Sequence, residues 1–445
     1  MNGAVTAMCR ALTAGLLLLA VNAAFGADLL DVYRQARASD ATYAAARATW
    51  AAAQERIPQG RAGLLPLASL SASLQQTERT TRFRDPALPR TSADGGSSSI
   101  SLSVTQPLYR RQNTIVYEQA LTQVEQADAQ LAAAAQELIL RVAQAYFDVL
   151  LAQDSVAFAG AQKTAIGQQL EQAKRNFEVG TATITDTHEA QARFDLTTAQ
   201  EIAARNDLEL RRRALEQVIG RVAPPLAPLG AAFTLKSPEP ATMEPWVALA
   251  QRSNLQVRVA QSSLTFATQE IARNRGAHYP TLDAFATLSD SGSGSNAISS
   301  NTDTRSAVVG VQLAFPIYQG GAINSRVREA IAIEDRARQD LENARRAAEF
   351  SARQAYLGIT SGAAQVLALE AALVSTQSQL SSTRLGQEVG VRTQVDVLNA
   401  QQLLFSARRD LAQSKYTYIL SLLRLEAAIG ELTEDDLVAV NQWLK

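Results

Sequence analysis

The sequence predicts an α+β membrane protein of very long helices and a few short strands, with an internal two-fold repeat. Between Arg111 and Glu178, apolar or small residues recur at alternating spacings of three and four, and no proline interrupts them. A heptad pattern kept this long predicts a helix of about 100 Å that packs lengthwise against other helices. A second proline-free stretch ends near Gln387. Before each stretch lie two segments in which apolar and polar residues alternate, the pattern of half-buried strands.

The composition argues against nucleic-acid binding. Of the 445 residues, 47% are hydrophobic but only 6% are aromatic, and the formal net charge is −1. Such a composition is typical of long helices and coiled coils. A chain with almost no net charge has no electrostatic reason to bind nucleic acid.

The first 26 residues read as a secretory signal peptide. They carry one basic residue, Arg10, an apolar run at 11–21, and a small-x-small cleavage site at 24–26. The only cysteine, Cys9, lies inside this segment, so we expect no disulfide in the mature chain. No later apolar run is long enough to predict a transmembrane helix.

The first half is predicted in the order helix, strand pair, long helix, turn, helix. A helix at 28–60 ends before Pro66, and two strands follow, separated by a polar loop at 78–98. The second strand closes at Pro107, beside the start of the long helix. A shorter helix at 183–220 completes the half. The turn between the two helices consists of Val179, Gly180 and Thr181.

The second half repeats this order. A helix at 245–277 leads to Pro280, two strands flank a polar loop at 289–304, and Pro316 precedes the second long helix. A helix at 393–430 follows the turn. That turn consists of Val389, Gly390 and Val391.

Identities at a constant offset support an internal duplication. Residues 178–180 and 388–390 are both Glu-Val-Gly, and Asp186 matches Asp396. We therefore expect a first structural repeat and a second one, separated by a linker with six prolines and followed by a tail, the linker and tail forming an equatorial belt. The predicted boundaries are 27–220 for the first repeat, 221–245 for the linker, 246–430 for the second repeat and 431–445 for the tail.

The strands predict an outer-membrane location. Each is predicted at about ten residues with two-residue alternation, the length that crosses an outer membrane at a tilt. Four strands cannot close a barrel, and open sheet edges are not tolerated in lipid. Three copies would supply about twelve strands, whereas two would supply about eight, too narrow for a duct. The alternative is four amphipathic strands in a soluble sheet.

The sequence contains no recognisable catalytic motif. There is no metalloprotease, nucleophile-elbow, phosphate-loop or dinucleotide fingerprint. The two histidines are isolated: His188 lies one turn past the first hairpin turn, and His278 precedes a Tyr-Pro pair. We therefore expect no enzyme, no cofactor and no metal site.

The ordered elements resemble the TolC family of outer-membrane efflux and type I secretion ducts over essentially the whole mature chain. The segment from Val389 to Ala400 resembles that family's inner hairpin tip, and the segment from Phe177 to Asp186 resembles the outer one. The resemblance implies a homotrimer with a twelve-stranded β-barrel continuous with a twelve-helix periplasmic tunnel. It also implies coupling to a periplasmic adaptor and an inner-membrane transporter of the ABC or RND class.

The same resemblance implies roles for residues at the tips. Arg392 would pair with Asp186 of a neighbouring copy, and Asp396 would belong to an acidic ring at a constriction. Asn399 stands where a second acidic ring position would fall, and Gln387 stands where some members have tyrosine. The two turns would dock the adaptor, and Pro66, Pro107, Pro280 and Pro316 would mark the strand–helix junctions. From the residues alone, Asp186 and Asp396 also suit the first turn of a helix.

Two other classes of protein stay open. A trimeric coiled-coil surface adhesin would carry its strands once, at the C-terminus, whereas this chain has strand pairs in both halves. A periplasmic structural or adaptor protein would lack strand pairs flanked by aromatic residues. The cargo of a duct, protein or small toxic compounds, is not encoded in any recognisable pattern.

Overall fold

A computed structural model describes residues 26–230, 232–294 and 302–444. All but the last residue of the predicted signal peptide lies outside these ranges. The described chain forms two compact units. One contains the chain up to Ala48, Ala129–Arg258 and Ala344 onward, and the other contains Thr49–Asp128 and Val259–Asn343.

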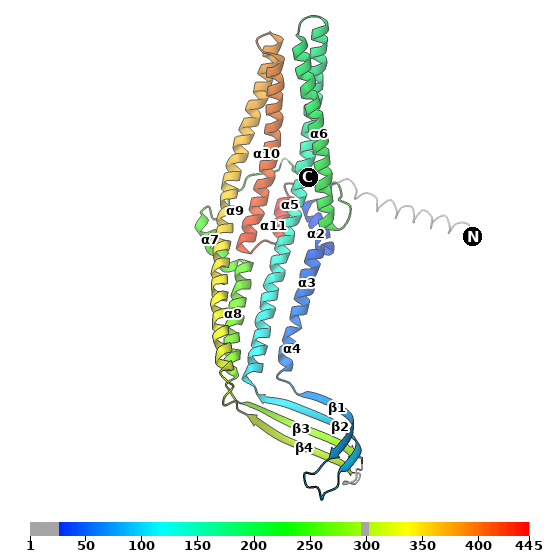
Figure 1. The fold of residues 1–445 in the computed structure, drawn as a ribbon. Helices are drawn as coiled ribbons and strands as arrows, with labels where there is room; N and C mark the ends of the chain where they lie inside the picture. Colours follow the sequence, from blue (N-terminus) through cyan, green and yellow to red (C-terminus); the bar gives the residue numbers. More distant parts are fainter. Residues whose placement is uncertain (1–25, 231, 295–301, 445) are drawn as a thin grey trace, which may run out of the picture. The chain divides into compact units, whose positions relative to one another are not determined.

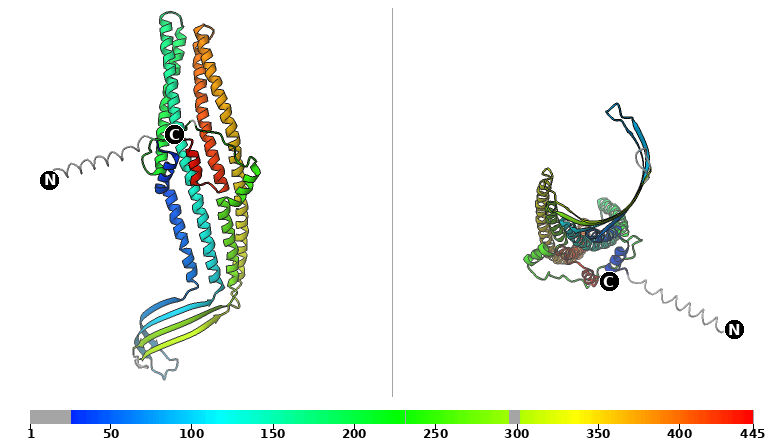
Figure 2. Two further views of the ribbon diagram at one scale, coloured as in Figure 1. Left: turned by 180° about the vertical axis from the view of Figure 1, so that it is seen from behind. Right: turned by 90° about the horizontal axis from the view of Figure 1, so that it is seen from below.

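The second unit contains one antiparallel sheet, in the order β1-β2-β3-β4 (Figure 1). The strands are β1 (Leu67–Thr81), β2 (Thr91–Tyr109), β3 (Thr281–Ser293) and β4 (Thr302–Ala314). They have 15, 19, 13 and 13 residues, so the expected length of about ten was too short. Seen from below, the sheet curves into an open crescent (Figure 2).

The predicted polar loops at 78–98 and 289–304 were wrong in extent. Register pairs continue from Glu78 opposite Asp94 to Thr81 opposite Thr91, and β3 continues to Ser293. Hydrophobic alternation stops before the strands do. Backbone hydrogen bonds extend the ladder without requiring apolar side chains.

The two faces of the sheet differ in chemistry. One face carries rows of serine hydroxyls that hydrogen-bond across strands, such as Ser71 with Ser101 at 2.7 Å and Ser289 with Ser306 at 2.6 Å. The opposite face carries an apolar band. Its members include Ala68, Leu70, Leu102, Val104, Ala286, Leu288, Ala307 and Val309.

An ion pair interrupts that apolar face on the row after Leu288. Arg305 Nε lies 3.0 Å from Asp290 Oδ2. The hydrophobic band is thus shorter than the strands, as expected of strands that leave a membrane before they turn.

The junction at the end of β2 combines a shift of register with an ion pair. The strand runs through Pro107 to Tyr109 rather than closing at Pro107, with a shift of register between the two residues. A proline lacks the N–H that a regular ladder needs, which accounts for the irregularity. Arg110 follows at once and pairs with Asp283 of β3 through two bonds, Nε to Oδ1 at 2.8 Å and Nη2 to Oδ2 at 2.6 Å.

The helices that precede each strand pair are interrupted, whereas single helices were expected at 28–60 and 245–277. The first consists of α2 (Leu29–Ser39), α3 (Ala41–Gln54) and α4 (Arg56–Ala62). At its first break, Asp40 Oδ1 accepts from the Tyr43 amide at 2.6 Å and from Arg141 Nη2 at 3.0 Å.

The break in the helix predicted at 245–277 is also capped by a side chain. It separates α7 (Met243–Ser253) from α8 (Leu255–Gly276) at Asn254. The Asn254 amide oxygen accepts from the Gln256 N–H at 2.9 Å, and its NH₂ group donates to the Ala428 carbonyl at 2.9 Å. Asp and Asn favour such caps because their short side chains satisfy free backbone groups.

The first long helix spans the range that its heptads predict, and the second ends one residue past the predicted end near Gln387. They are α5 (Arg111–Glu178) with 68 residues and α9 (Ala322–Glu388) with 67 residues. Asp128 and Lys163 fall on the heptad positions of α5, and both have partners. Trp50 Nε1 donates to Asp128 at 2.6 Å, and Lys163 lies 2.9 Å from Glu201. By length and composition alone α9 could cross a membrane, contrary to the expectation of no such helix; one such helix is weak evidence of a span.

Two helices follow the turns, α6 (Ile184–Ile219) and α10 (Gln394–Ile429). Both end at a glycine in the left-handed conformation, Gly220 with φ 68° and Gly430 with φ 81°. A residue with a side chain is strained there, which explains glycine at these helix ends.

The linker and the C-terminal tail pack together on the first unit. Leu229 forms a β-bridge with Leu444, and the Phe233 ring contacts Tyr418 of α10 and Trp443. The tail contains a further helix, α11 (Glu434–Asn441), that the sequence did not indicate.

Glu426 of α10 gives this region a pH dependence. Partial burial, then the neighbouring carboxylates of Asp436 and Glu431, raise the pKa of Glu426 to about 7. The pKa of a glutamate in the unfolded chain is about 4.3. Between this pH and a pH of about 7, therefore, only the folded chain holds the proton on Glu426. Stability is therefore expected to fall as the pH rises through this window.

Glu426→Gln tests this expectation, because glutamine imitates the protonated side chain. The substitution should raise Tm at pH 8 and leave it nearly unchanged at pH 5. Thermal unfolding of the detergent-solubilised protein at both pH values measures the difference. An equal shift at the two values would exclude Glu426 as the source of the pH dependence.

Candidate channel entrance

Two helical hairpins in the first unit end in similar turns (Figure 1). The first hairpin is α5, residues 179–183 and α6; the second hairpin is α9, residues 389–393 and α10. Gly180 has φ 76° and Gly390 has φ 78°, and each lets its chain leave a helix abruptly. The apolar side chains beside them point into solvent. Val179 is 73% exposed, Val389 67% and Val391 75%.

The outgoing helices begin with the same capping box. Asp186 Oδ2 accepts from the Thr183 N–H at 3.0 Å and from its hydroxyl at 2.8 Å, while the Thr183 hydroxyl oxygen accepts from the Asp186 N–H. Asp396 and Thr393 repeat the arrangement at 2.9 and 3.0 Å. Both aspartates thus cap helices in this chain.

The cap also affects ionisation at the second turn. Hydrogen bonds from the Thr393 backbone and hydroxyl, and then the Arg392 charge, hold the pKa of Asp396 below its usual range. The Asp396 carboxylate is therefore charged at neutral pH.

Arg392 lies exposed on the second turn, against α9. A Cβ at Gly386 would approach Arg392 Cγ to 2.7 Å, so the glycine makes room for the arginine side chain. Among the described residues of this single chain, no ion pair joins Arg392 to Asp186.

Gln387 lies near the end of α9 and hydrogen-bonds to a glutamine of α10. Its NH₂ group donates to Gln394 Oε1 at 3.2 Å, and Gln394 Nε2 donates to the Gln169 carbonyl on α5 at 2.9 Å. Gln387 thus holds the side chain of Gln394, which connects the second hairpin to the first.

Asn399 also connects the hairpins. Arg193 of α6 donates from Nη2 to Asn399 Oδ1 at 3.0 Å and from Nη1 to Gln402 Oε1 at 2.8 Å. The residue at the expected second acidic position therefore accepts from a guanidinium on α6.

Near the tips, each hairpin contains a buried apolar cluster of its own. In the first, Phe194 packs on a buried cluster of Leu170, Ala173 and Ala190. The cluster of the second consists of Leu380, Val397, Ala400 and Leu404.

Farther from the tips, aromatic side chains connect the hairpins. The Tyr416 hydroxyl of α10 donates to Asp154 Oδ2 on α5 at 2.7 Å, and its ring stacks on Phe147 with centroids 5.5 Å apart. Burial raises the pKa of Asp154, and the Tyr416 hydroxyl partly offsets that shift. At this level of the bundle, buried aromatic and polar contacts connect α5 to α10.

Several buried polar atoms on these helices have no hydrogen-bond partner. Gln401 of α10 is 0% exposed, and neither its amide nitrogen nor its amide oxygen is paired. Burial of an unpaired polar group costs about 1–3 kcal/mol. Thr187 Oγ1 and Gln169 Oε1 are buried in the same way.

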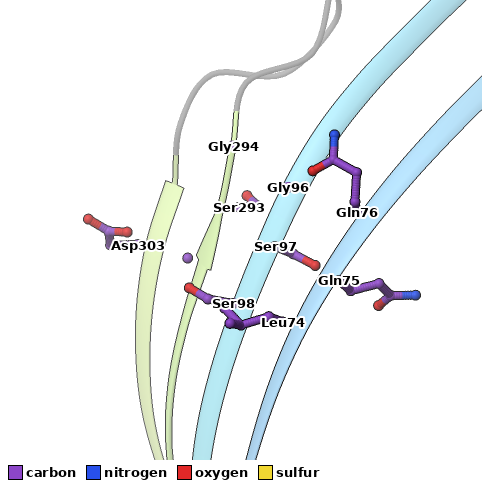
Figure 3. A pocket seen from close by; sticks show the side chains of 10 residues that line it. Leu74, Gln75, Gln76, Gly96, Ser97, Ser98, Ser293, Gly294 and Asp303 are labelled. Atoms are coloured by element: carbon purple, nitrogen blue, oxygen red, sulfur yellow. The ribbon is translucent and has the colours of Figure 1, made fainter.

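The sheet has a shallow pocket of about 610 Å³ near the end of β3 and the start of β4 (Figure 3). Small and neutral polar residues line most of it, including Gly96, Ser97 and Ser293, and Asp303 is its one carboxylate. In the described ranges no group of three or more His, Cys, Asp or Glu side chains could hold a metal ion. His278, placed by the sequence beside a junction, shares a hydrogen bond of 3.2 Å with Asn324.

Sequence reasoning identified the turns and the capping aspartates but missed Arg193, Gln394 and Gln402. The Thr-x-x-Asp pattern and the glycines are local signals. The contacts of Arg193 join residues about 200 positions apart, and no local pattern marks such a pair.

Known proteins match this chain over most of its length. The family described as outer membrane efflux protein matches residues 32–221 and 246–431. The outer membrane protein TolC of Vibrio cholerae is 37% identical over 428 residues, which cover 95% of each chain. The alkaline protease secretion protein AprF of Pseudomonas aeruginosa is 34% identical over 436 residues, covering 95% of this chain and 89% of AprF. The solved outer membrane protein VceC of Vibrio cholerae shares the fold, with a TM-score of 0.75 at 18% identity over 90% of this chain and 96% of VceC.

Proposed function

We propose, from the premise that this chain belongs to the outer membrane efflux protein family, that three copies share one β-barrel and one helical tunnel. The protein is an outer-membrane exit duct for efflux and secretion. The open sheet is the main observation that supports a trimer. Both β1 and β4 are edge strands in the described chain.

The open edges require partners in a membrane. Unpaired backbone groups at a sheet edge cannot be satisfied by lipid, so a spanning sheet must close. Four strands per copy give twelve in a trimer, within the range of outer-membrane barrels. The apolar band would then face lipid and the serine rows would face the lumen.

The helices also leave apolar surface for neighbouring copies. On α9, Phe350 is 67% exposed and Val374 67%, and on α6 Ile202 is 64% exposed. Such residues at helical spacing are expected to pack against the next protomer. Each copy would contribute four helical positions to a tunnel of twelve.

The domain division follows from the same proposal. The repeats at 27–220 and 246–430 would each build half of a protomer, and the family match in two segments supports this division. The linker at 221–245 and the tail at 431–445, which pair through Leu229 and Leu444, would form the equatorial belt.

The exposed turns are the proposed docking surface for a periplasmic adaptor. Valines 67–75% exposed at both turns offer an apolar surface that a soluble tip would not need. An inner-membrane ABC or RND transporter would act through the adaptor. We assign no reaction, cofactor, metal or nucleic-acid partner to the chain.

Arg392, Asp186 and Asp396 are the proposed gate. Among the residues that the structure describes, Asp186 is engaged only by its own cap, and Arg392 is exposed, so both are available to a neighbouring copy. Asp396 would contribute one carboxylate per copy to the ring, whereas Asn399 contributes none. An exposed ion pair contributes about 0–1 kcal/mol, which a docking partner can offset.

Planar-bilayer recording of the purified protein tests the duct. We expect discrete channels that persist as the detergent is diluted. A protein that inserts but never conducts would contradict the proposal. Complementation of a strain that lacks its efflux duct, scored separately for toxic compounds and for a secreted protease, identifies the cargo.

A further inference from the structure

Near the tips, side-chain hydrogen bonds connect the two hairpins. The buried clusters lie within each hairpin. The connections run from α10 to both helices of the first hairpin, through Gln394 to α5 and through Asn399 and Gln402 to Arg193 of α6. Hydrogen bonds in a partly exposed place can be exchanged for water, so this level of the bundle can separate.

Arg193 donates two of these hydrogen bonds. Its guanidinium donates to two amide oxygens that lie one helical turn apart on α10, at 2.8 and 3.0 Å. Both acceptors are neutral, so the bonds are charge-assisted on one side only. A carboxylate at either position would hold the arginine more tightly.

Arg193 has a second acceptor on its own helix. Glu189 Oε1 lies 3.9 Å from Arg193 Nη2, one turn earlier in α6. If α10 moves away, the guanidinium can turn fully to Glu189. The guanidinium thus has acceptors both across the hairpins and within α6.

Gln401 opposes the contact between the hairpins. It lies on α10 between the two acceptors of Arg193 in sequence, is fully buried, and has both amide atoms unpaired. A movement of α10 that gives this amide water or a partner removes the cost of leaving it unpaired. The same helix is thus held by Arg193 and destabilised by Gln401.

We propose that Arg193 latches α10 to α6 within each protomer and that buried Gln401 favours its release, so that the two residues together set how readily the entrance opens. The proposal rests on the proposed duct and gate and adds to them a positioning residue inside the protomer. Arg193 acts by holding α10, which carries Asp396, while the Arg392–Asp186 contact acts between copies.

Single-channel recording of purified trimers in planar bilayers tests the latch. Arg193→Gln should raise the ratio of open to closed time by about two- to fivefold for each of the three copies, the effect of losing one partly exposed charged contact per copy. Arg193→Lys should have an intermediate effect. Asn399→Asp, which offers a carboxylate, should lower the ratio below that of the wild type, but only while Arg193 is present.

Gln401→Leu tests the opposing contribution. Leucine removes the unpaired amide and keeps much of the volume, so this variant should lower the open ratio. Arg213→Gln is the matched control because Arg213 of α6 pairs within its helix, with Glu209 and Glu216. The control should conduct like the wild type.

The outcomes separate the latch from the duct. If the wild type forms no channels, both proposals fail. If the wild type conducts and Arg392→Ser opens it, but Arg193→Gln and Asn399→Asp both behave like the wild type, the latch alone is refuted. A rise in the open ratio for Gln401→Leu would refute the role given to the buried amide. Because Arg193 and Asn399 are partly exposed and exposed, respectively, trimer yield is expected to stay normal in their variants.

Discussion

Gly390→Pro is expected to abolish export while the trimer still assembles. Gly390 has φ 78°, and proline is restricted to about −65°, so the turn cannot keep its shape. The substitution also removes the Gly390 N–H, which donates to the Gln387 carbonyl at 3.1 Å. The sheet and the apolar clusters do not include this residue, so assembly should be unaffected.

Export assays in a complemented strain, together with the size of the detergent-extracted protein, measure the two effects. Gly390→Ala is the graded variant because it keeps the N–H and costs only about 1–2 kcal/mol of left-handed strain. Gly160→Ala is the control, since a Cβ at Gly160 meets nothing within 4 Å. Normal export by a folded, trimeric Gly390→Pro variant would show that the turn is not a docking surface.

Arg392→Ser is expected to raise single-channel conductance. The change removes the proposed contact with Asp186 of a neighbouring copy at three equivalent places in the trimer. Each contact is weak, at about 0–1 kcal/mol, but the three act together on one opening. High salt, which screens exposed charges, should reduce the difference between variant and wild type.

Arg384→Ser is the matched control for this charge. Arg384 lies exposed two turns earlier on α9, so its replacement removes the same charge from the tip region without touching the turn. Equal conductance of Arg392→Ser and the wild type would remove Arg392 from the gate.

The sequence was sufficient where the physical signal is local and periodic. The heptads of α5 located a helix from Arg111 to Glu178, because burial of one face repeats along the whole helix. The turns at Gly180 and Gly390 and the aspartates that follow were found for the same reason. Glycine at positive φ and a threonine cap are requirements of a few neighbouring residues.

The sequence was insufficient where structure depends on distant partners. The outer parts of the strands, such as Glu78 opposite Asp94, are held by the ladder and carry no apolar alternation. The break at Asn254 depends partly on the Ala428 carbonyl of α10, which is remote in sequence. The contact of Arg193 with Asn399 likewise requires that two hairpins already lie side by side.

The size and symmetry of the detergent-extracted protein test the central claim, that one chain has too few strands to close a barrel. Mass measurement combined with electron cryomicroscopy should find three copies around a threefold axis, with twelve strands in one closed sheet. A protein that is stable and monodisperse as a single subunit in detergent-free buffer would contradict the account.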